Sequence, residues 1–338
     1  MSEGATPREA GFSMPAEWNH HAATLMAWPV DQAYWDGRVE EAREEYAAIA
    51  RTIAAFEPVI MVCNPGDRAG VRDRCGTEVE PLAIPIDDSW IRDSGPIFLR
   101  NDRGEVAAVT FRFNAWGNRQ PAYAKDDAMP YAVAKHLGMQ IFSAPFVLEG
   151  GAILTDGDGT LLTTEMCLLN PNRNPGMSRE RLEQGLRDHL GVEVIVWLPY
   201  GMAGDVGPLA TDGHVDGVAH YLAPGKILLL VPDDPDDEDH GYGRANLERL
   251  RETRDARGRV IEAIPLPGAN GANAYANCYV ANGAVIAPTV GCDMDAEGIA
   301  RLERAFPDRE VIGLPAATIA FGGGGPHCIT QQVPEAGS

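Results

Sequence analysis

The stretch Gly322-Gly323-Gly324-Gly325-Pro326-His327-Cys328-Ile329-Thr330 is the part of the sequence around which the chain is organised. Four consecutive glycines allow the backbone to approach a ligand closely and to adopt angles that other residues do not reach. The loop then presents one thiol, Cys328, just before residues that favour a strand. Sulfur is intrinsically nucleophilic and needs only a base or a lowered pKa, so Cys328 is a candidate nucleophile. The alternative is a small buried apolar side chain, as most free cysteines are.

Composition limits the classes of partner that the chain can have. The 338 residues are 45% hydrophobic, which is enough for a large core. The chain has 28 Lys and Arg against 49 Asp and Glu, a formal net charge of -21 at pH 7. Nucleic acids and anionic membrane surfaces are bound through basic patches, so neither is expected as a partner. The charge is compatible with a small cationic substrate, although it is also an ordinary route to solubility.

The cysteines and the N-terminal segment predict the cellular compartment of the protein. The six cysteines are scattered, with no C-x-x-C pair and no zinc-ligand spacing, which favours free thiols in a reducing compartment. Residues 1–12 lack the apolar run of a signal peptide, and no apolar run approaches the ~20 residues that span a bilayer. We therefore expect a cytoplasmic protein.

Strand-like and helical segments alternate along the chain about five times. No change in composition marks a linker, and no repeat is detectable at the residue level. Such alternation favours one α/β domain over two separate domains. We expect residues 1–12 to form a flexible N-terminal arm and residues 13–334 to form a single domain.

Four further clusters carry side chains capable of chemistry. They are residues 87–96 with Trp90 and Asp93, residues 148–151 with Glu149, residues 211–217 with His214 and Asp216, and residues 275–278 with Asn277. A carboxylate amid apolar residues, as in the second cluster, needs a cation or an imidazole as its partner. If the third cluster is extended, its imidazole and carboxylate point to the same face. Each cluster alone also has a structural interpretation, such as a surface ion pair or a structural histidine.

Together the clusters supply a thiol, an imidazole, a carboxylate that could orient the imidazole, and two further carboxylates. A cysteine protease needs only the thiol, the imidazole, one orienting group and oxyanion donors. Two more anions beside a thiol suit an electrophile that is itself a cation. A guanidinium fits this description, because its N–H groups pair bidentately with carboxylates.

The chain resembles the agmatine deiminase and bacterial peptidylarginine deiminase-like family, within the guanidino-group-modifying superfamily. The resemblance is carried by MPAEW at 14–18, WIRDSGP at 90–96, LEGG at 148–151, GHVD at 213–216 and HCITQQ at 327–332. These motifs run nearly from end to end of the chain in fixed order. The resemblance implies a five-bladed pseudosymmetric α/β propeller, a pentein, with the active site in its central channel.

The resemblance also implies a role for each residue of the catalytic set. Cys328 would attack the guanidinium carbon. His214 would protonate the departing ammonia and then activate water, and Glu149 would hold His214. Asp93 and Asp216 would grip the guanidinium nitrogens.

The implied enzyme is a guanidine deiminase with a covalent thiouronium intermediate, a ureido product and ammonia, in the context of polyamine metabolism. Trp90 would line the channel, and Asn277 would take a polar substrate-binding position. No metal and no organic cofactor is implied. The expected binding partner is a small cationic guanidino substrate. We also expect the chain to form a homo-oligomer, with a dimer as the expected form.

The chain departs from the agmatine deiminase pattern in one motif. That pattern tends to read Glu-Thr-Asn-Gly-His-Val-Asp-Asn, whereas this chain has Ala210, Asp212 and Gly217 at the first, third and last positions. The missing Glu could pair with the distal ammonium of agmatine, and a buried ammonium without a partner costs several kcal/mol. We expect agmatine to be a poorer substrate than a guanidino compound with a neutral, anionic or bulkier tail, unless the amine reaches Asp87 or Asp88.

Two other functions remain open from the sequence alone. An amidinotransferase would pass the amidino group to an amine rather than to water, so ammonia release without an added amine separates it from a deiminase. A non-catalytic acidic binding module is a different class of protein. The assembly of five catalytic groups argues against that class.

Overall fold

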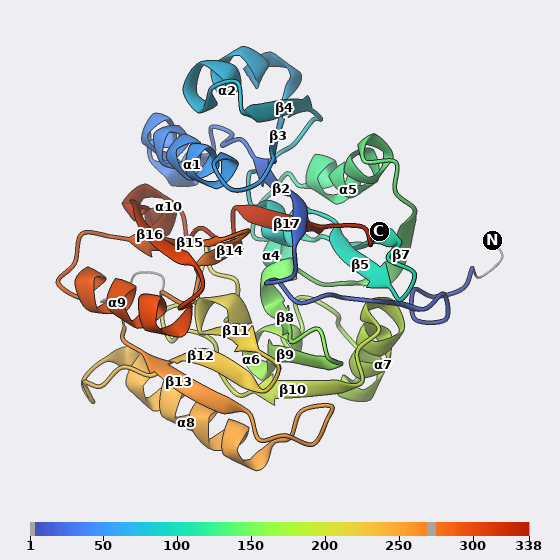
Figure 1. Ribbon diagram of the computed structural model, residues 1–338, viewed down its shortest axis with the longest axis vertical. Coiled ribbons are helices and arrows are strands. Elements are labelled where there is room, and N and C mark those ends of the chain that lie inside the picture. Colours follow the sequence, from blue (N-terminus) through green and yellow to red (C-terminus); the bar gives the residue numbers. More distant parts are fainter. Residues whose placement is uncertain (1–3, 269–274, 338) are drawn as a thin grey trace.

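The computed structural model describes residues 4–268 and 275–337 of the chain. Within these ranges the strands form five sheets of three or four strands. Figure 1 shows the sheets placed around a common centre, with the long helices toward the outside. The inner ends of the sheets therefore face one shared centre.

Each sheet repeats one pattern of connection, which the sheet of β11, β12 and β13 illustrates. Strand β11 (Ala219–Ala223) pairs antiparallel with β12 (Lys226–Leu230). Helix α8 (Glu238–Glu252) packs on the sheet and returns the chain to β13 (Glu262–Leu266), which is parallel to β12. Parallel strands need such a crossover, whereas antiparallel strands need only a tight turn.

Three further sheets follow the same order of two antiparallel strands, a helical crossover and a parallel strand. The first contains β14 (Tyr279–Ala281), β15 (Ala284–Thr289), α9 (Asp295–Ala305) and β16 (Glu310–Pro315). The second contains β8 (Ile153–Thr155), β9 (Thr160–Thr164), α6 (Glu165–Leu168), α7 (Arg179–Leu190) and β10 (Val194–Leu198). The third contains β1 (Phe12–Ser13), β5 (Ile97–Asn101), β6 (Val106–Arg112), α4 (Ala115–Asn118), α5 (Ala124–His136) and β7 (Ile141–Val147).

The remaining sheet closes the ring by joining the two ends of the chain. Strand β17 (Thr330–Pro334) pairs antiparallel with β2 (His21–Ala27). The chain continues through α1 (Val39–Ala54), β3 (Val59–Cys63), α2 (Arg68–Cys75) and β4 (Val79–Ala83). All five residues of β3 are buried and apolar, as expected for a parallel strand covered on both faces.

Short helical elements lie at the junctions and in the connections. They are η1 (Ala33–Trp35), η2 (Pro65–Asp67), α3 (Ile91–Ser94), η3 (Gly150–Ala152), η4 (Val215–Gly217) and α10 (Ala317–Phe321). In the described part of the chain, no helix has the length and apolar composition required to cross a bilayer.

The α/β fold expected from the sequence is confirmed, and the repeat absent from the residue pattern is present in the topology. The junction before the first strand of each unit carries one of the expected site residues. Asp93 precedes β5, Glu149 precedes β8, Asp216 precedes β11, Asn277 precedes β14 and Cys328 precedes β17. The same position in five repeated units therefore supplies the site.

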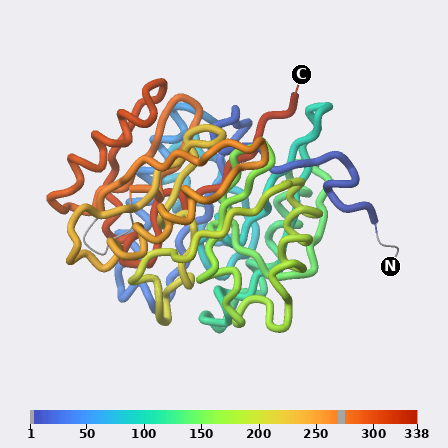
Figure 2. The backbone as a smooth tube through the Cα atoms, turned by 90° about the horizontal axis from the view of Figure 1, so that it is seen from below, coloured from blue at the N-terminus to red at the C-terminus, as the bar shows by residue number. Residues whose placement is uncertain are grey.

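The segment expected to be a flexible arm is described from residue 4 onward. Arg8 N donates to the carbonyl of Asp188 at 3.1 Å, and Met14 N donates to the carbonyl of Leu190 at 2.8 Å. Phe12 is buried. Figure 2 shows this segment running along the outside of the molecule. These contacts attach it to the end of α7, and flexibility in solution stays a prediction.

Candidate active site

Cys328 lies at the inner end of the glycine-rich loop, two residues before β17. The loop passes tightly over Trp90, because a Cβ atom on Gly324 would lie 2.2 Å from the Trp90 ring. Only glycine allows this approach. The loop thereby places the Cys328 thiol 3.2 Å from Asn277 Nδ2 and 3.6 Å from Asp216 Oδ2.

The surroundings of the Cys328 thiol favour its neutral form. Burial, followed by the negative fields of Asp216 and Asp93, raises the pKa of Cys328 well above its usual value. A cation bound between the two carboxylates would oppose this effect, since an opposite charge nearby favours the thiolate.

Glu149 is fully buried and is held by a cation that the sequence analysis did not identify. Its Oε1 accepts a hydrogen bond from Arg173 Nε at 2.8 Å. Burial opposes ionisation of Glu149, but the Arg173 guanidinium and the His214 imidazole lower its pKa to about 2. The other oxygen, Oε2, lies 3.8 Å from His214 Nε2, and neither atom has a hydrogen-bond partner among the described residues. A small shift would join them, and catalytic hydrogen bonds are often long in unliganded enzymes.

His214 lies between two carboxylates. Its Nδ1 is 3.7 Å from Asp93 Oδ1, on the side opposite Glu149. Burial disfavours the imidazolium, but Asp93, then Cys167 and Glu149, outweigh burial and raise the pKa of His214 well above its ordinary value. The surroundings therefore favour an imidazolium at His214 and a neutral thiol at Cys328.

Asp93 is oriented by two donors. Trp116 Nε1 donates to Asp93 Oδ2 at 2.9 Å, and the backbone N–H of Gly151 donates to Oδ1 at 2.9 Å. Burial raises the pKa of Asp93, which the positive field of His214 opposes and the negative field of Asp216 reinforces. Asp93 thus has its orientation fixed but lacks a strong cationic partner.

Asp216 is held by His327, which lies one residue before the thiol in the sequence. His327 Nδ1 is 2.8 Å from Asp216 Oδ2, and its Nε2 is 2.9 Å from Glu17 Oε1. His327 is fully buried, and Arg92 Nη1 donates to Glu17 at 3.3 Å. Burial favours the neutral Asp216 carboxyl, but the bond from His327 outweighs it and lowers the pKa of Asp216. This chain of contacts keeps one of the two substrate-facing carboxylates ionised.

Gly151 forms the floor between these groups. A Cβ atom on Gly151 would lie 2.6 Å from His214 Nδ1, 2.8 Å from Asp93 Oδ1 and 2.9 Å from Asp216 Oδ2. The imidazole and both carboxylates therefore converge on one point that glycine alone leaves open.

The motif around His214 is not extended, contrary to the conditional expectation from the sequence. His214 precedes the 3₁₀ turn η4, which contains Asp216. The backbone N–H groups of Thr211 and Gly213 donate to the Asp205 carboxylate at 2.7 and 2.8 Å, which curls the loop. His214 and Asp216 still meet at the site, but through a turn rather than through strand alternation.

Asp212 is not free to bind a substrate amine. It adopts a left-handed backbone conformation with a φ of 64°. Its carboxylate is paired with Arg119 and Arg173 and accepts from Asn172 Nδ2 at 2.9 Å. Its neighbour Ala210 does line the cavity and offers no charge there.

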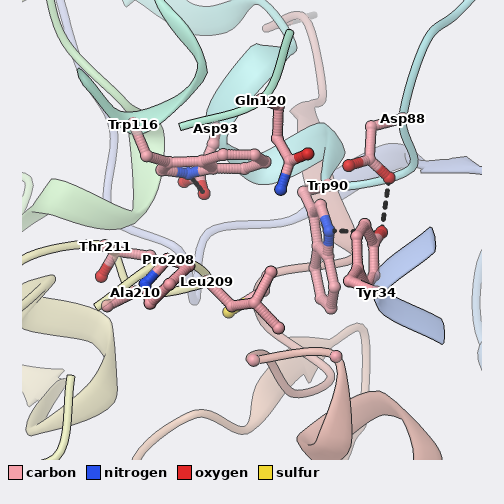
Figure 3. A pocket seen from close by; sticks show the side chains of 13 residues that line it. Tyr34, Asp88, Trp90, Asp93, Trp116, Gln120, Pro208, Leu209, Ala210 and Thr211 are labelled. Atoms are coloured by element: carbon pink, nitrogen blue, oxygen red, sulfur yellow. Dashed lines mark hydrogen bonds between the residues drawn. The ribbon is translucent and has the colours of Figure 1, made fainter. Parts of the chain in front are cut away.

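The expected substrate-facing residues line the walls of two connected cavities that both reach Cys328. In the narrower cavity, Trp90 and Trp116 form aromatic walls (Figure 3). Trp90 is fixed because its Nε1 donates to Tyr34 at 3.0 Å and its ring stacks on Trp35, with centroids 6.0 Å apart. The wider cavity has a volume of about 910 Å³ and opens past the acidic residues 236–239.

The structure gathers every residue expected from the sequence at this place. The residues that line one or both cavities are Trp90, Asp93, His214, Asp216, Asn277 and Cys328. Glu149 lies behind His214.

Two groups of buried side chains have metal-binding atoms within 4.8 Å of one another. They are Glu17, His220 and His327, and Glu149, Cys167 and His214. In the first group both ring nitrogens of His327 already face carboxylates, and in the second Arg173 already balances the charge of Glu149. Within the described residues, His220 Nδ1, His214 Nε2 and Glu149 Oε2 have no hydrogen-bond partner, so hydrogen bonds and ion pairs satisfy only part of each group.

The fold and the site define a protein of the pentein class, in which α/β sheets surround a centre with a thiol, an imidazole and carboxylates. The chain belongs to the Porphyromonas-type peptidyl-arginine deiminase family, whose model matches residues 13–334.

Relatives extend over nearly the whole chain. The agmatine deiminase of Pseudomonas aeruginosa strain LESB58 is 40% identical over 362 residues, covering 98% of this chain and 97% of that protein. The solved structure of the agmatine deiminase of Enterococcus faecalis has a TM-score of 0.93 at 32% identity and covers 98% of both chains. A dimethylarginine dimethylaminohydrolase structure, at 17% identity and a TM-score of 0.55, shares the fold.

Proposed function

We propose that the chain is a guanidine deiminase, a hydrolase of C–N bonds in linear amidines that acts on a small cationic guanidino substrate. The observation that carries the proposal is the convergence of His214, Asp93 and Asp216 on one point above Gly151. Cys328 reaches the same place, with its thiol 3.6 Å from Asp216. The relatives at about 40% identity are agmatine deiminases, which supports this reaction rather than amidino transfer to an amine.

Binding of the guanidinium would favour ionisation of the Cys328 thiol. A guanidinium between Asp93 and Asp216 would donate N–H groups to both carboxylates. Its positive charge would offset the fields that raise the pKa of the Cys328 thiol. The thiol then gives its proton to solvent water, and the thiolate attacks the guanidinium carbon to form a C–S bond.

His214 handles the protons of both half-reactions. The imidazolium gives its proton to the departing nitrogen, the C–N bond breaks, and ammonia leaves a thiouronium on Cys328. The neutral imidazole then takes a proton from water, and the resulting hydroxide adds to the thiouronium carbon. The C–S bond breaks with return of the electron pair to sulfur, the hydroxyl proton passes to that sulfur, and the ureido product leaves with the Cys328 thiol regenerated. Glu149 holds the imidazole throughout, anchored by Arg173.

The assay that tests the function measures ammonia and ureido product across a panel of substrates without an added amine. Agmatine, arginine, 4-guanidinobutyrate and arginyl peptides form the panel. Ammonia and ureido product in equal amounts are the expected result. Turnover only when an acceptor amine is present would instead identify an amidinotransferase, and no turnover of any guanidino compound would contradict the proposal.

We also propose that residues 13–334 form a single catalytic domain, since the family model matches the same span. Cytoplasmic location and assembly into a dimer stay predictions. Size-exclusion chromatography with light scattering tests the assembly.

The ionisation of Cys328 gives a prediction for the empty enzyme. Because burial, Asp216 and Asp93 all raise the thiol pKa, we expect alkylation by iodoacetamide to be slow at neutral pH and to rise only above pH ~8.5. The measurement is the rate of mass gain at Cys328 by peptide mass spectrometry, with Cys328→Ala reporting the background from other thiols. A rate profile with a midpoint well below pH 7 would show a preformed thiolate and contradict the argument.

A further inference from the structure

Three side chains with metal-binding atoms come together around the imidazole of the active site. They are Glu149, Cys167 and His214, and each offers one donor atom within 4.8 Å of the other two. All three side chains are buried. The proposed reaction uses the carboxylate and the imidazole but gives no role to the Cys167 thiol. A ligand that binds all three groups would account for the thiol.

Two of the donor atoms lack a hydrogen-bond partner among the described residues. They are Glu149 Oε2 and His214 Nε2, which lie 3.8 Å apart. Tetrahedral ligands about 2.0 to 2.3 Å from a zinc ion lie roughly 3.3 to 3.5 Å from one another, so a small shift would bring both atoms onto one ion. Buried polar atoms without partners are costly, and a bound cation would offset that cost.

The outer contacts of these two ligands resemble those of a metal site. Arg173 Nε donates to Glu149 Oε1 at 2.8 Å, which leaves Oε2 for another partner. Arg173 also pairs with Asp212, so Glu149 does not balance its charge alone. His214 Nδ1 lies 3.7 Å from Asp93 Oδ1, and ligating histidines ordinarily present their second ring nitrogen to such a group. These neighbours orient the ligands without occupying the place of an ion.

The start of α6 holds the Cys167 thiol beside the imidazole. Thr164 caps this short helix, since its side-chain oxygen accepts from the Cys167 backbone N–H at 3.2 Å. The same hydroxyl donates to the carbonyl of Gly213, the residue before His214, at 2.5 Å. One side chain thus ties the backbone at the thiol to the backbone at the imidazole, so the two ligands are held together before an ion arrives.

The kind of donor atoms favours zinc over harder cations. Thiolate sulfur and imidazole nitrogen are zinc ligands, whereas calcium and magnesium take oxygen ligands. Three protein ligands leave the fourth tetrahedral position for water. His214 also lines the wide cavity, and the acidic residues 236–239 at its mouth would concentrate cations. The route for the ion runs through this cavity and past the imidazole.

We propose that Glu149, Cys167 and His214 bind Zn²⁺ and that the bound ion inhibits the enzyme. The ion takes Cys167 as the thiolate and His214 as the neutral imidazole, and the displaced protons pass to solvent. With its Nε2 on the ion, His214 neither protonates the departing nitrogen nor activates water. Inhibition by zinc rests on the proposed function, whereas binding of zinc does not.

Inhibition through this site has a kinetic signature. Asp93, Asp216 and Cys328 are not ligands of the ion, so the guanidino substrate still binds. Zinc should therefore lower kcat and leave KM nearly unchanged. Zinc bound to the Cys328 thiol would instead take the place of the substrate and raise the apparent KM, which would contradict inhibition through Cys167.

Calorimetry with zinc chloride tests the binding site itself. The protein is the Cys292→Ala/Cys328→Ala variant, which lacks the two thiols that are not buried. We expect one zinc ion per chain. Adding Cys167→Ala should weaken binding by more than about 100-fold, because outer-shell partners alone contribute about 10- to 100-fold to metal affinity. Adding Cys63→Ala, which removes a buried thiol in β3, is the matched control and should change the affinity by less than about twofold.

Cobalt provides a readout that needs no substitution at residue 167. Co²⁺ bound to the Cys292→Ala/Cys328→Ala variant should show a thiolate-to-cobalt charge-transfer band, which zinc removes because it binds such sites more tightly. Absence of this band, absence of zinc binding, or unchanged affinity on adding Cys167→Ala with a wild-type circular dichroism spectrum would each overturn the proposal. The deiminase function would then stand. Absence of guanidino turnover would contradict the function instead, and calorimetry would still decide the zinc site.

Discussion

Replacing Cys328 by serine is expected to lower kcat by about 10⁴-fold or more and to leave the fold intact. The hydroxyl occupies nearly the same volume at the end of the glycine-rich loop, so packing changes little. A serine hydroxyl is a much weaker nucleophile than a thiolate. Asp216, 3.6 Å from the sulfur, would disfavour the alkoxide further. The other thiol near His214, that of Cys167, is fully buried and lines neither cavity, so it could not replace the lost nucleophile.

Steady-state ammonia release measures the loss, and Cys328→Ala provides the control that removes the heteroatom altogether. Both variants should retain the wild-type Tm and should bind the guanidino compound. In His214→Ala, which lacks the acid for ammonia departure and the base that activates water, mass spectrometry should find an adduct of substrate mass on Cys328. Full activity in Cys328→Ser would exclude a covalent thiouronium mechanism.

The sequence indicated candidate site residues where side chains capable of catalysis lie close together in short motifs. Cys328, His214, Glu149, Asp93 and Asp216 lie in short motifs, and the structure brings all five together. Each motif sits at the junction before the first strand of a repeated unit, so the topology repeats although the residues do not. Residue-level comparison could not reveal that repeat, because each junction carries a different functional side chain.

The residues that hold this set could not be predicted from spacing. His327 and Glu17 are 310 positions apart and meet only because β17 pairs with β2 and closes the ring. Arg173 reaches Glu149 from a loop between two helices, where a single Arg has many possible partners. Recognising such contacts requires knowing which sheets are adjacent, which the local pattern does not encode.

The expected geometry around His214 was wrong for a related reason. Strand alternation assumes that backbone groups pair with a neighbouring strand. Here they pair with the side chain of Asp205 instead, and Gly213 adopts a φ of 88°. A side chain that competes for backbone hydrogen bonds replaces the strand with a turn. The turn still aims both His214 and Asp216 at the centre.

Gly151 should prove as indispensable as a catalytic side chain, although it carries none. Gly151→Ala is expected to lower kcat/KM by about 10³-fold, because a Cβ atom 2.6 to 2.9 Å from His214, Asp93 and Asp216 displaces the groups that bind the guanidinium. The Gly151 backbone does not have a positive φ, so alanine introduces no backbone strain. The matched control is Gly70→Ala on α2, whose Cβ would meet nothing within 4 Å and should change kcat/KM by less than about twofold. Thermal denaturation separates the two explanations for a loss. A wild-type Tm with lost activity supports displacement of the groups that bind the guanidinium. If Gly151→Ala retained more than about a tenth of wild-type activity, the close packing of these groups over Gly151 would not be required for substrate binding.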